Sequence, residues 1–136
     1  REEVAPRLIA SLEASLAAAQ IGYTHMPALG GLRHAHKDSP NAAWRNASFR
    51  GYADYMQTPE FEMHLQQAID LAQQLPSELM CAEAVPWRCH RSLVADALTA
   101  RGLTVCEISS PTKATPHVLT PWSHVEHGRV TYPAKT

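Results

Sequence analysis

The sequence predicts an α/β fold in which a small, mostly parallel sheet is flanked by helices. Three segments repeat apolar side chains at helical spacing, and short apolar runs typical of buried strands precede and follow the third segment. A chain of 136 residues can bury one core but is too short for two independent ones. We therefore expect residues 1–136 to form a single domain.

The N-terminal part predicts a helix, a short strand and a long loop. Leucines recur at every fourth position within residues 4–20, which indicates an amphipathic helix, and Gly22 supplies its end. The run 21–26 predicts a brief strand. Residues 29–55 are polar and lack clear periodicity, so they predict a long loop, and one helical turn is expected at its end, over 52–56. Loops of this length are typical of lids and binding loops, with a disordered connector as the alternative, and two large aromatic residues favour an ordered binding loop.

A second helix is predicted to begin at Pro59. Thr58 before it can cap the helix, and Glu60 places an acid in the first turn. Apolar residues then continue at helical spacing until Pro76 ends the helix.

The last part of the chain predicts a βαβ unit. Residues 93–98 repeat apolar side chains at helical spacing, and Gly102 closes this third helix. The helix lies between two apolar runs, 78–84 and 104–108, which predict parallel neighbouring strands. Residues 112–136 are rich in Pro and His, and we expect them to wrap the surface.

The turn 81–91, between the first of these strands and the third helix, is the predicted functional site. Ligands of open α/β sheets bind beyond the carboxyl ends of the strands. Backbone N–H groups and the positive end of the helix dipole favour anions there, and Arg88, His90 and Arg91 add cationic side chains. The sequence thus predicts a local anion site in a chain whose net charge is only −1.

Cysteines in and near this turn are the candidate nucleophiles. Cys89 falls in the first helical turn, where the dipole and nearby cations favour the thiolate, and Cys81 is the second candidate. His90 or Glu83 would serve as acid or base. Simple packing is the alternative for both cysteines, and for Cys106, on a predicted strand, it is the expectation.

Composition excludes several classes of function. Twelve basic and 13 acidic residues leave no general electrostatic footprint for nucleic acid or an anionic membrane, and no apolar run approaches the roughly 20 residues of a membrane span. Three cysteines, an odd number, argue against a disulfide framework and favour a reducing, cytoplasmic location. Neither a secretory signal nor a nucleotide-binding glycine motif is present, so we expect no membrane partner and no cofactor.

Two close histidine pairs leave metal binding open as an alternative. His34 and His36 form one pair, and His124 and His127 form the other. Neither has the paired spacing of a structural zinc site, so we expect no bound metal.

Several motifs resemble the domain of unknown function 488 family over residues 21–132. They are YTHMPALGG (23–31), SPN (39–41), WRN (44–46), FRGYADYM (49–56), CAE (81–83) and CHR (89–91). The resemblance implies a bacterial α/β domain of unestablished activity. It points to these matching positions: Arg33, Trp44, Arg45, Arg50, Tyr52, Cys81, Glu83, Cys89, His90 and Arg91. Family members begin with another strand-helix-strand segment, so we expect this chain to lack it and to cover its exposed strand edges with a partner, such as a second copy.

The leading hypothesis is an enzyme, or a former enzyme, that binds a small phosphorylated or nucleotide-like anion between turn 81–91 and loop 29–55. Planar guanidinium groups match phosphate in two-point geometry, and aromatic rings can stack on a base. The arginines would be Arg88, Arg91 and Arg45 or Arg50, and the ring Trp44 or Tyr52. One alternative is a binding module without chemistry for a nucleotide or a nucleic-acid end. Another is a structural or interaction domain.

Overall fold

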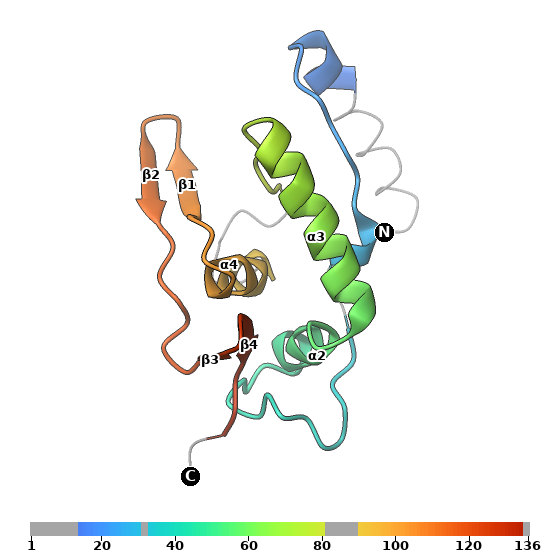
Figure 1. The fold of residues 1–136 in the computed structure, drawn as a ribbon, viewed down its shortest axis with the longest axis vertical. Coiled ribbons are helices and arrows are strands. Elements are labelled where there is room, and N and C mark those ends of the chain that lie inside the picture. The colour runs from blue at the N-terminus through green and yellow to red at the C-terminus, as the bar shows by residue number, and fades with distance from the viewer. Residues whose placement is uncertain (1–13, 31–32, 81–89, 135–136) are drawn as a thin grey trace.

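The computed structural model describes residues 14–30, 33–80 and 90–134. Its helical elements are η1 (Pro27–Leu29), α2 (Ala47–Tyr55), α3 (Pro59–Gln74) and α4 (Arg91–Ala100). Its strands are β1 (Cys106–Ser110), β2 (Lys113–Pro116), β3 (His124–Glu126) and β4 (Arg129–Thr131) (Figure 1). Over these described ranges, none of the helices has the length and apolar character needed to cross a membrane.

The prediction of a mostly parallel sheet is wrong. The described strands form two separate two-stranded sheets, and both β1 with β2 and β3 with β4 pair antiparallel. Each pair is joined by a two-residue connection, which suits antiparallel neighbours, whereas a parallel neighbour requires a crossover of a dozen or more residues. The predicted strand at 104–108 does appear, shifted to Cys106–Ser110, but it pairs with the segment that follows it.

The other two predicted strands are not seen where the structure describes the chain. Residues 21–26 carry no regular secondary structure, and neither do residues 78–80, while residues 81–84 lie outside the described part. An apolar run forms a strand only when a partner strand satisfies its backbone N–H and C=O groups. Hydrophobicity in the sequence carries no information about that partner.

The helix predicted at Pro59 is confirmed as α3. The Thr58 hydroxyl accepts a hydrogen bond from the backbone N–H of Phe61 at 3.2 Å, and Pro59 is the first helical residue. The third predicted helix is confirmed as α4, and Gly102 follows it with a φ of 86°. Residues 14–18, within the first predicted helix, are also helical.

The predicted loop 29–55 contains a helix, α2, in its second half. Asn46 caps this helix, because its side-chain oxygen accepts hydrogen bonds from the backbone N–H groups of Ser48 at 2.8 Å and Phe49 at 3.3 Å. Of the two large aromatic residues taken as marks of an ordered loop, Tyr52 lies on the buried face of α2, and Trp44, just before the helix, is also buried in the core.

One hydrophobic core joins the helices to the end of the chain. Its largest fully buried apolar side chains are Tyr52, Phe61, Leu65, Leu93 and Tyr132. The C-terminal segment 112–136 was expected to wrap the surface, but it carries three strands and contributes Val130 and Tyr132 to the core. The backbone N–H of Tyr132 donates to the side chain of buried Asn41 at 2.9 Å, which fixes the segment against the 36–44 region. Figure 1 shows β4 close to α2 and α4.

Candidate functional site

The start of α4 meets the 29–55 segment in space. The ring of His90, the N-cap residue of α4, lies with its centroid 4.9 Å from that of Tyr52 in α2. The Tyr52 hydroxyl donates a hydrogen bond of 2.8 Å to the carbonyl of Leu29. Three segments that are distant in sequence therefore converge here, and we call this place the α2–α4 junction.

Arg33 packs against α2, the helix that carries Tyr52. Its guanidinium carbon lies 3.8 Å from the ring centroid of Tyr55, a neighbour of Tyr52 on α2. Arg33 Nη2 and the Tyr55 hydroxyl both donate to the carbonyl of Ala28, at 3.4 and 2.6 Å. Arg33 Nε is buried and has no hydrogen-bond partner within the described residues. A buried guanidinium donor without a partner is costly, so this atom is a candidate ligand contact.

Gly51 allows the Arg33 segment to approach α2 this closely. A Cβ atom at Gly51 would lie 2.1 Å from the carbonyl oxygen of Arg33 and 2.8 Å from the backbone nitrogen of Ala35. Only a residue without a side chain fits this contact. Gly51 thereby sets the position of Arg33.

The junction holds a neutral histidine beside arginines. Burial lowers the pKa of His90 below its usual 6.5, and the charge of Arg91 acts in the same direction, although a hydrogen bond with the Leu29 backbone opposes them. A neutral imidazole at neutral pH has one nitrogen able to accept a proton. The chemistry available here is anion binding by guanidinium groups and proton acceptance by His90.

The two candidate stacking residues lie in the core. Tyr52 is 1% exposed, and Trp44 packs its ring against Phe49 and Trp122 at 5.1 Å and against Tyr132 at 5.3 Å. Their ring faces are covered by protein, and the structure shows them as supports for neighbouring residues.

The remaining predicted site residues divide into two groups. Arg45 is exposed just before α2, and Arg50 on α2 donates from Nη1 to the carbonyl of Trp44 at 3.1 Å. The others, Cys81, Glu83, Arg88 and Cys89, lie outside the described residues. Cys106, expected to be a packing residue, is instead exposed on β1, because this two-stranded sheet leaves both of its faces open over most of its length.

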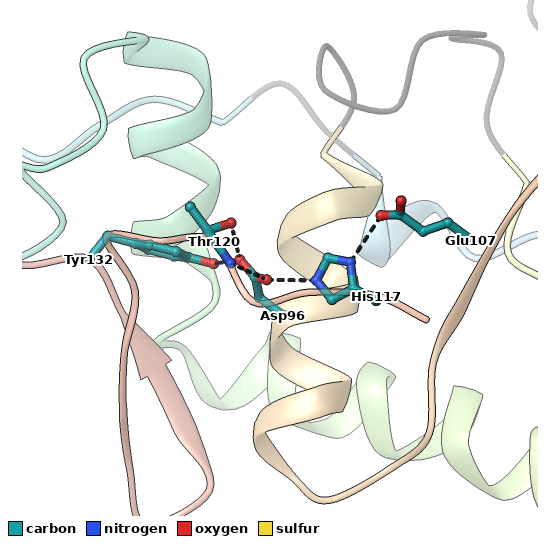
Figure 2. Close-up of polar contacts among 5 residues, drawn as sticks. All are labelled: Asp96, Glu107, His117, Thr120 and Tyr132. Carbon is teal, nitrogen blue, oxygen red and sulfur yellow. Dashed lines mark hydrogen bonds and ion pairs between the residues drawn. The ribbon is translucent and has the colours of Figure 1, made fainter. Parts of the chain in front are cut away.

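A second cluster, which the sequence did not reveal, surrounds Asp96 in α4. The carboxylate is fully buried and accepts four hydrogen bonds from the C-terminal part of the chain (Figure 2). They come from His117 Nε2 at 2.7 Å, the Thr120 N–H at 3.1 Å and hydroxyl at 2.6 Å, and the Tyr132 hydroxyl at 2.7 Å. We call this the Asp96 cluster. One signal in the sequence could have indicated this cluster. Asp96 follows Leu93 by three residues and so lies on the apolar face of a predicted helix.

His117 lies between two carboxylates in this cluster. Its Nδ1 contacts Glu107 of β1 at 2.9 Å, while Nε2 contacts Asp96, and its side chain is only 5% exposed. Burial alone would lower the pKa of His117, but hydrogen bonds to the two carboxylates and their negative charges outweigh it, so that the pKa is raised. The imidazolium form therefore links the β1–β2 hairpin to α4.

Asp54 organises the segment before α2 in a similar way. It accepts hydrogen bonds from the His36 N–H at 2.8 Å, the Ser39 hydroxyl at 2.6 Å and the Asn41 amide at 2.8 Å. Burial would raise the pKa of Asp54, but these hydrogen bonds lower it overall. The carboxylate stabilises a segment that contains turns but no regular secondary structure.

Histidines and acids do not gather into a metal centre in the part of the chain that the structure describes. Within these ranges there is no group of three or more His, Cys, Asp or Glu side chains placed to hold an ion. His124 and His127 flank Glu126 at 3.5 and 3.9 Å, and all three are largely exposed. His34 and His36 are exposed as well.

Comparison with known proteins gives one match. The family model described as "Domain of unknown function DUF488" matches residues 8–98, a range that contains α2, α3 and the first part of α4. No curated protein matches the chain, and no solved structure does. The matched range includes the whole α2–α4 junction.

Proposed function

Because the chain belongs to the domain of unknown function DUF488 family and the matched range holds the α2–α4 junction, we propose that this junction binds a small anionic ligand. The family description assigns no activity, so the proposal depends on geometry. The contact between the rings of Tyr52 and His90 carries it, since this contact brings the start of α4 against the segment that holds Arg33.

Arg33 and Arg91 are the proposed anion-binding residues. The ring of Tyr55 holds the Arg33 guanidinium in place. Its Nε, which has no partner among the residues that the structure describes, provides a donor that a ligand oxygen can satisfy. Arg91 is the first residue of α4, where the helix dipole also favours a negative charge. A phosphorylated or nucleotide-like ligand fits these groups best, because guanidinium pairs bind phosphate oxygens at two points.

The other sequence-based candidates take supporting or chemical roles in this proposal. Tyr52 positions His90, Trp44 and Arg50 hold the start of α2, and exposed Arg45 is available to a larger ligand. The chemical step is a prediction from the sequence. In it Cys89 is the nucleophile with Cys81 as the second candidate, His90 or Glu83 is the acid or base, and Arg88 is a further anion contact.

A thermal-shift screen tests the binding step. The panel holds inorganic phosphate, sugar phosphates and nucleoside monophosphates, each compared with sodium chloride at equal ionic strength. A ligand that binds only the folded chain raises Tm. We expect at least one phosphorylated ligand to do so, and Arg33→Gln to remove most of the shift while Lys37→Gln, a nearby exposed lysine, leaves it unchanged. No shift from any panel member, or an equal shift in Arg33→Gln, contradicts the proposal.

Two further measurements distinguish an enzyme from a binding module and a small ligand from nucleic acid. Cys89→Ser should retain ligand binding and lose turnover of any substrate that the screen identifies, and unchanged turnover removes the covalent step. Binding to single-stranded nucleic acid should weaken steeply as salt rises, whereas a pocketed small ligand depends less on salt.

A further inference from the structure

We propose a second site, specific for a phosphate group, in the hollow where α3, the end of α4 and the β3–β4 turn meet. It shares no residue with the α2–α4 junction. The hollow encloses about 360 Å³, opens broadly to solvent and is lined by Glu62, Arg101, His127, Gly128 and Arg129. This volume is at the lower end of the range for small-molecule sites.

The hollow contains more positive than negative charge. Arg101, at the end of α4, forms an ion pair with Glu62 of α3. Arg129 of β4 is exposed and makes no ion pair with any residue in the described ranges. The two arginines and one glutamate therefore leave one positive charge for a ligand to neutralise.

The two guanidinium groups lie close enough to repel each other. Burial lowers the pKa of Arg101, and the positive charge of Arg129 lowers it further. An anion placed between them would relieve this repulsion and receive charge-assisted hydrogen bonds from both. Glu62 holds Arg101 in place and thereby limits the rotamer entropy lost when the anion binds.

The backbone fixes where Arg129 stands. The two residues that connect β3 to β4, His127 and Gly128, both have positive φ values, of 54° and 75°, as a tight hairpin turn requires. A Cβ at Gly128 would lie 3.9 Å from the carbonyl oxygen of Ala100, so the turn lies beside the last turn of α4. The side chain of Arg129 begins directly after this turn, and Arg129 lines the same hollow as Arg101.

A phosphate group is the chemistry that these residues favour. Two guanidinium groups offer planar pairs of donors that match phosphate oxygens. Nucleic acid would require a longer basic track. Among the described residues that line the hollow, His127 is the only other one able to carry a positive charge. The expected ligand is a small phosphorylated molecule or free phosphate.

Titration of the ¹⁵N-labelled chain with inorganic phosphate, against sodium chloride at matched ionic strength, tests this site. We expect the Gly128 and Arg129 amide signals to shift and saturate with phosphate alone. Arg129→Gln should weaken this binding about tenfold or more, the amount expected for loss of a charged hydrogen bond. Lys113→Gln on β2, an exposed lysine outside the hollow, should leave it unchanged.

The outcomes also separate this site from the junction. Arg33→Gln should leave the Gly128 and Arg129 shifts intact, and the His90 amide reports the junction independently. If the Gly128 and Arg129 amide signals shift equally in chloride, or if Arg129→Gln keeps the same phosphate affinity, the second site is overturned. This holds whether or not the α2–α4 junction binds phosphate. Because Arg129 is exposed and outside the core, its substitution should leave the fold intact, and the circular dichroism spectrum checks this.

Discussion

His117 Nε2 donates to the carboxylate of Asp96 across 2.7 Å, although 21 residues separate them in the chain. This contact joins the segment after β2 to the middle of α4. Asp96 is fully buried and His117 nearly so, which gives the pair more influence on stability than a surface ion pair has. Because α4 also carries His90 at its start, the Asp96 cluster helps to position the α2–α4 junction.

Stability should fall as the pH rises above neutral, because His117 loses its proton. The folded-state pKa of His117 lies above the unfolded value of 6.5, so its contribution is fully present below 6.5 and disappears as the pH rises through the folded pKa. Urea unfolding should show a free energy of unfolding that falls progressively between pH 6.5 and 9. His117→Gln should abolish this slope.

His25→Gln, at an exposed histidine, is the control for this slope and should retain it. Measurements above pH 6.5 also avoid the contribution of His90. The folded-state pKa of His90 is lowered, so the contribution of the neutral His90 ring to the free energy of unfolding is constant above pH 6.5. This contribution is lost only as the pH falls through the folded-state pKa. A pH-independent free energy of unfolding in the unsubstituted chain would contradict the assignment of a protonated His117.

Asp96→Asn should be among the most destabilising single changes. It removes the charge that balances His117 and replaces an acceptor of four hydrogen bonds with an amide that also presents donors. Loss of one member of a buried charged pair costs about 3 to 5 kcal/mol. Asp38→Asn, at an exposed acid, should change the free energy of unfolding by less than about 0.5 kcal/mol in the same urea experiment.

Gly51→Ala should destabilise the chain and displace Arg33. The new methyl group meets the Arg33 carbonyl, a backbone atom that cannot rotate away, and overpacking of this kind costs about 1 to 3 kcal/mol. The variant should also lose the thermal shift given by junction ligands. Gly22→Ala, where nothing lies within 4 Å, should have neither effect. A Gly51→Ala chain with normal stability and ligand response would show that the close approach is unimportant.

Asn46→Ala should weaken α2 through loss of its cap. Two backbone N–H groups lose their acceptor, and such a change costs about 1 kcal/mol. Ser48→Ala, at an exposed position in the first turn of α2, keeps the cap and should be close to neutral. Helical content by circular dichroism and urea unfolding measure the difference, and equal stability of the two variants would contradict the role of Asn46.

Local signals predicted the helices well. Thr58 and Pro59 mark the start of α3 by interactions within one turn of the chain, and the α4 pattern likewise depends only on neighbours. Only one helical turn, at 52–56, was expected where α2 lies, because Gly51 and several polar residues obscure the periodicity of this helix. The parallel sheet was wrong because strand pairing depends on partners that local hydrophobicity does not specify.

Sequence reasoning singled out several residues that lie together in the structure, and their roles in binding or catalysis stay predictions. The family resemblance pointed to Arg33, Tyr52 and His90, which the fold brings together at one junction. The burial of Trp44 and Tyr52 depends on the tertiary core, so the sequence could not distinguish packing rings from stacking rings. The Asp96 cluster joins residues up to 36 positions apart, and only its acid on an apolar helix face was visible beforehand.

The titration curve of the His90 ring, followed by NMR in phosphate and in chloride at equal ionic strength, tests anion binding at the α2–α4 junction most directly. Burial keeps the pKa of His90 low in the free chain, and a bound anion should raise it by stabilising the imidazolium form. We expect a higher His90 pKa in phosphate, and no such rise in Arg33→Gln. The same His90 pKa in phosphate and in chloride would contradict anion binding at this junction.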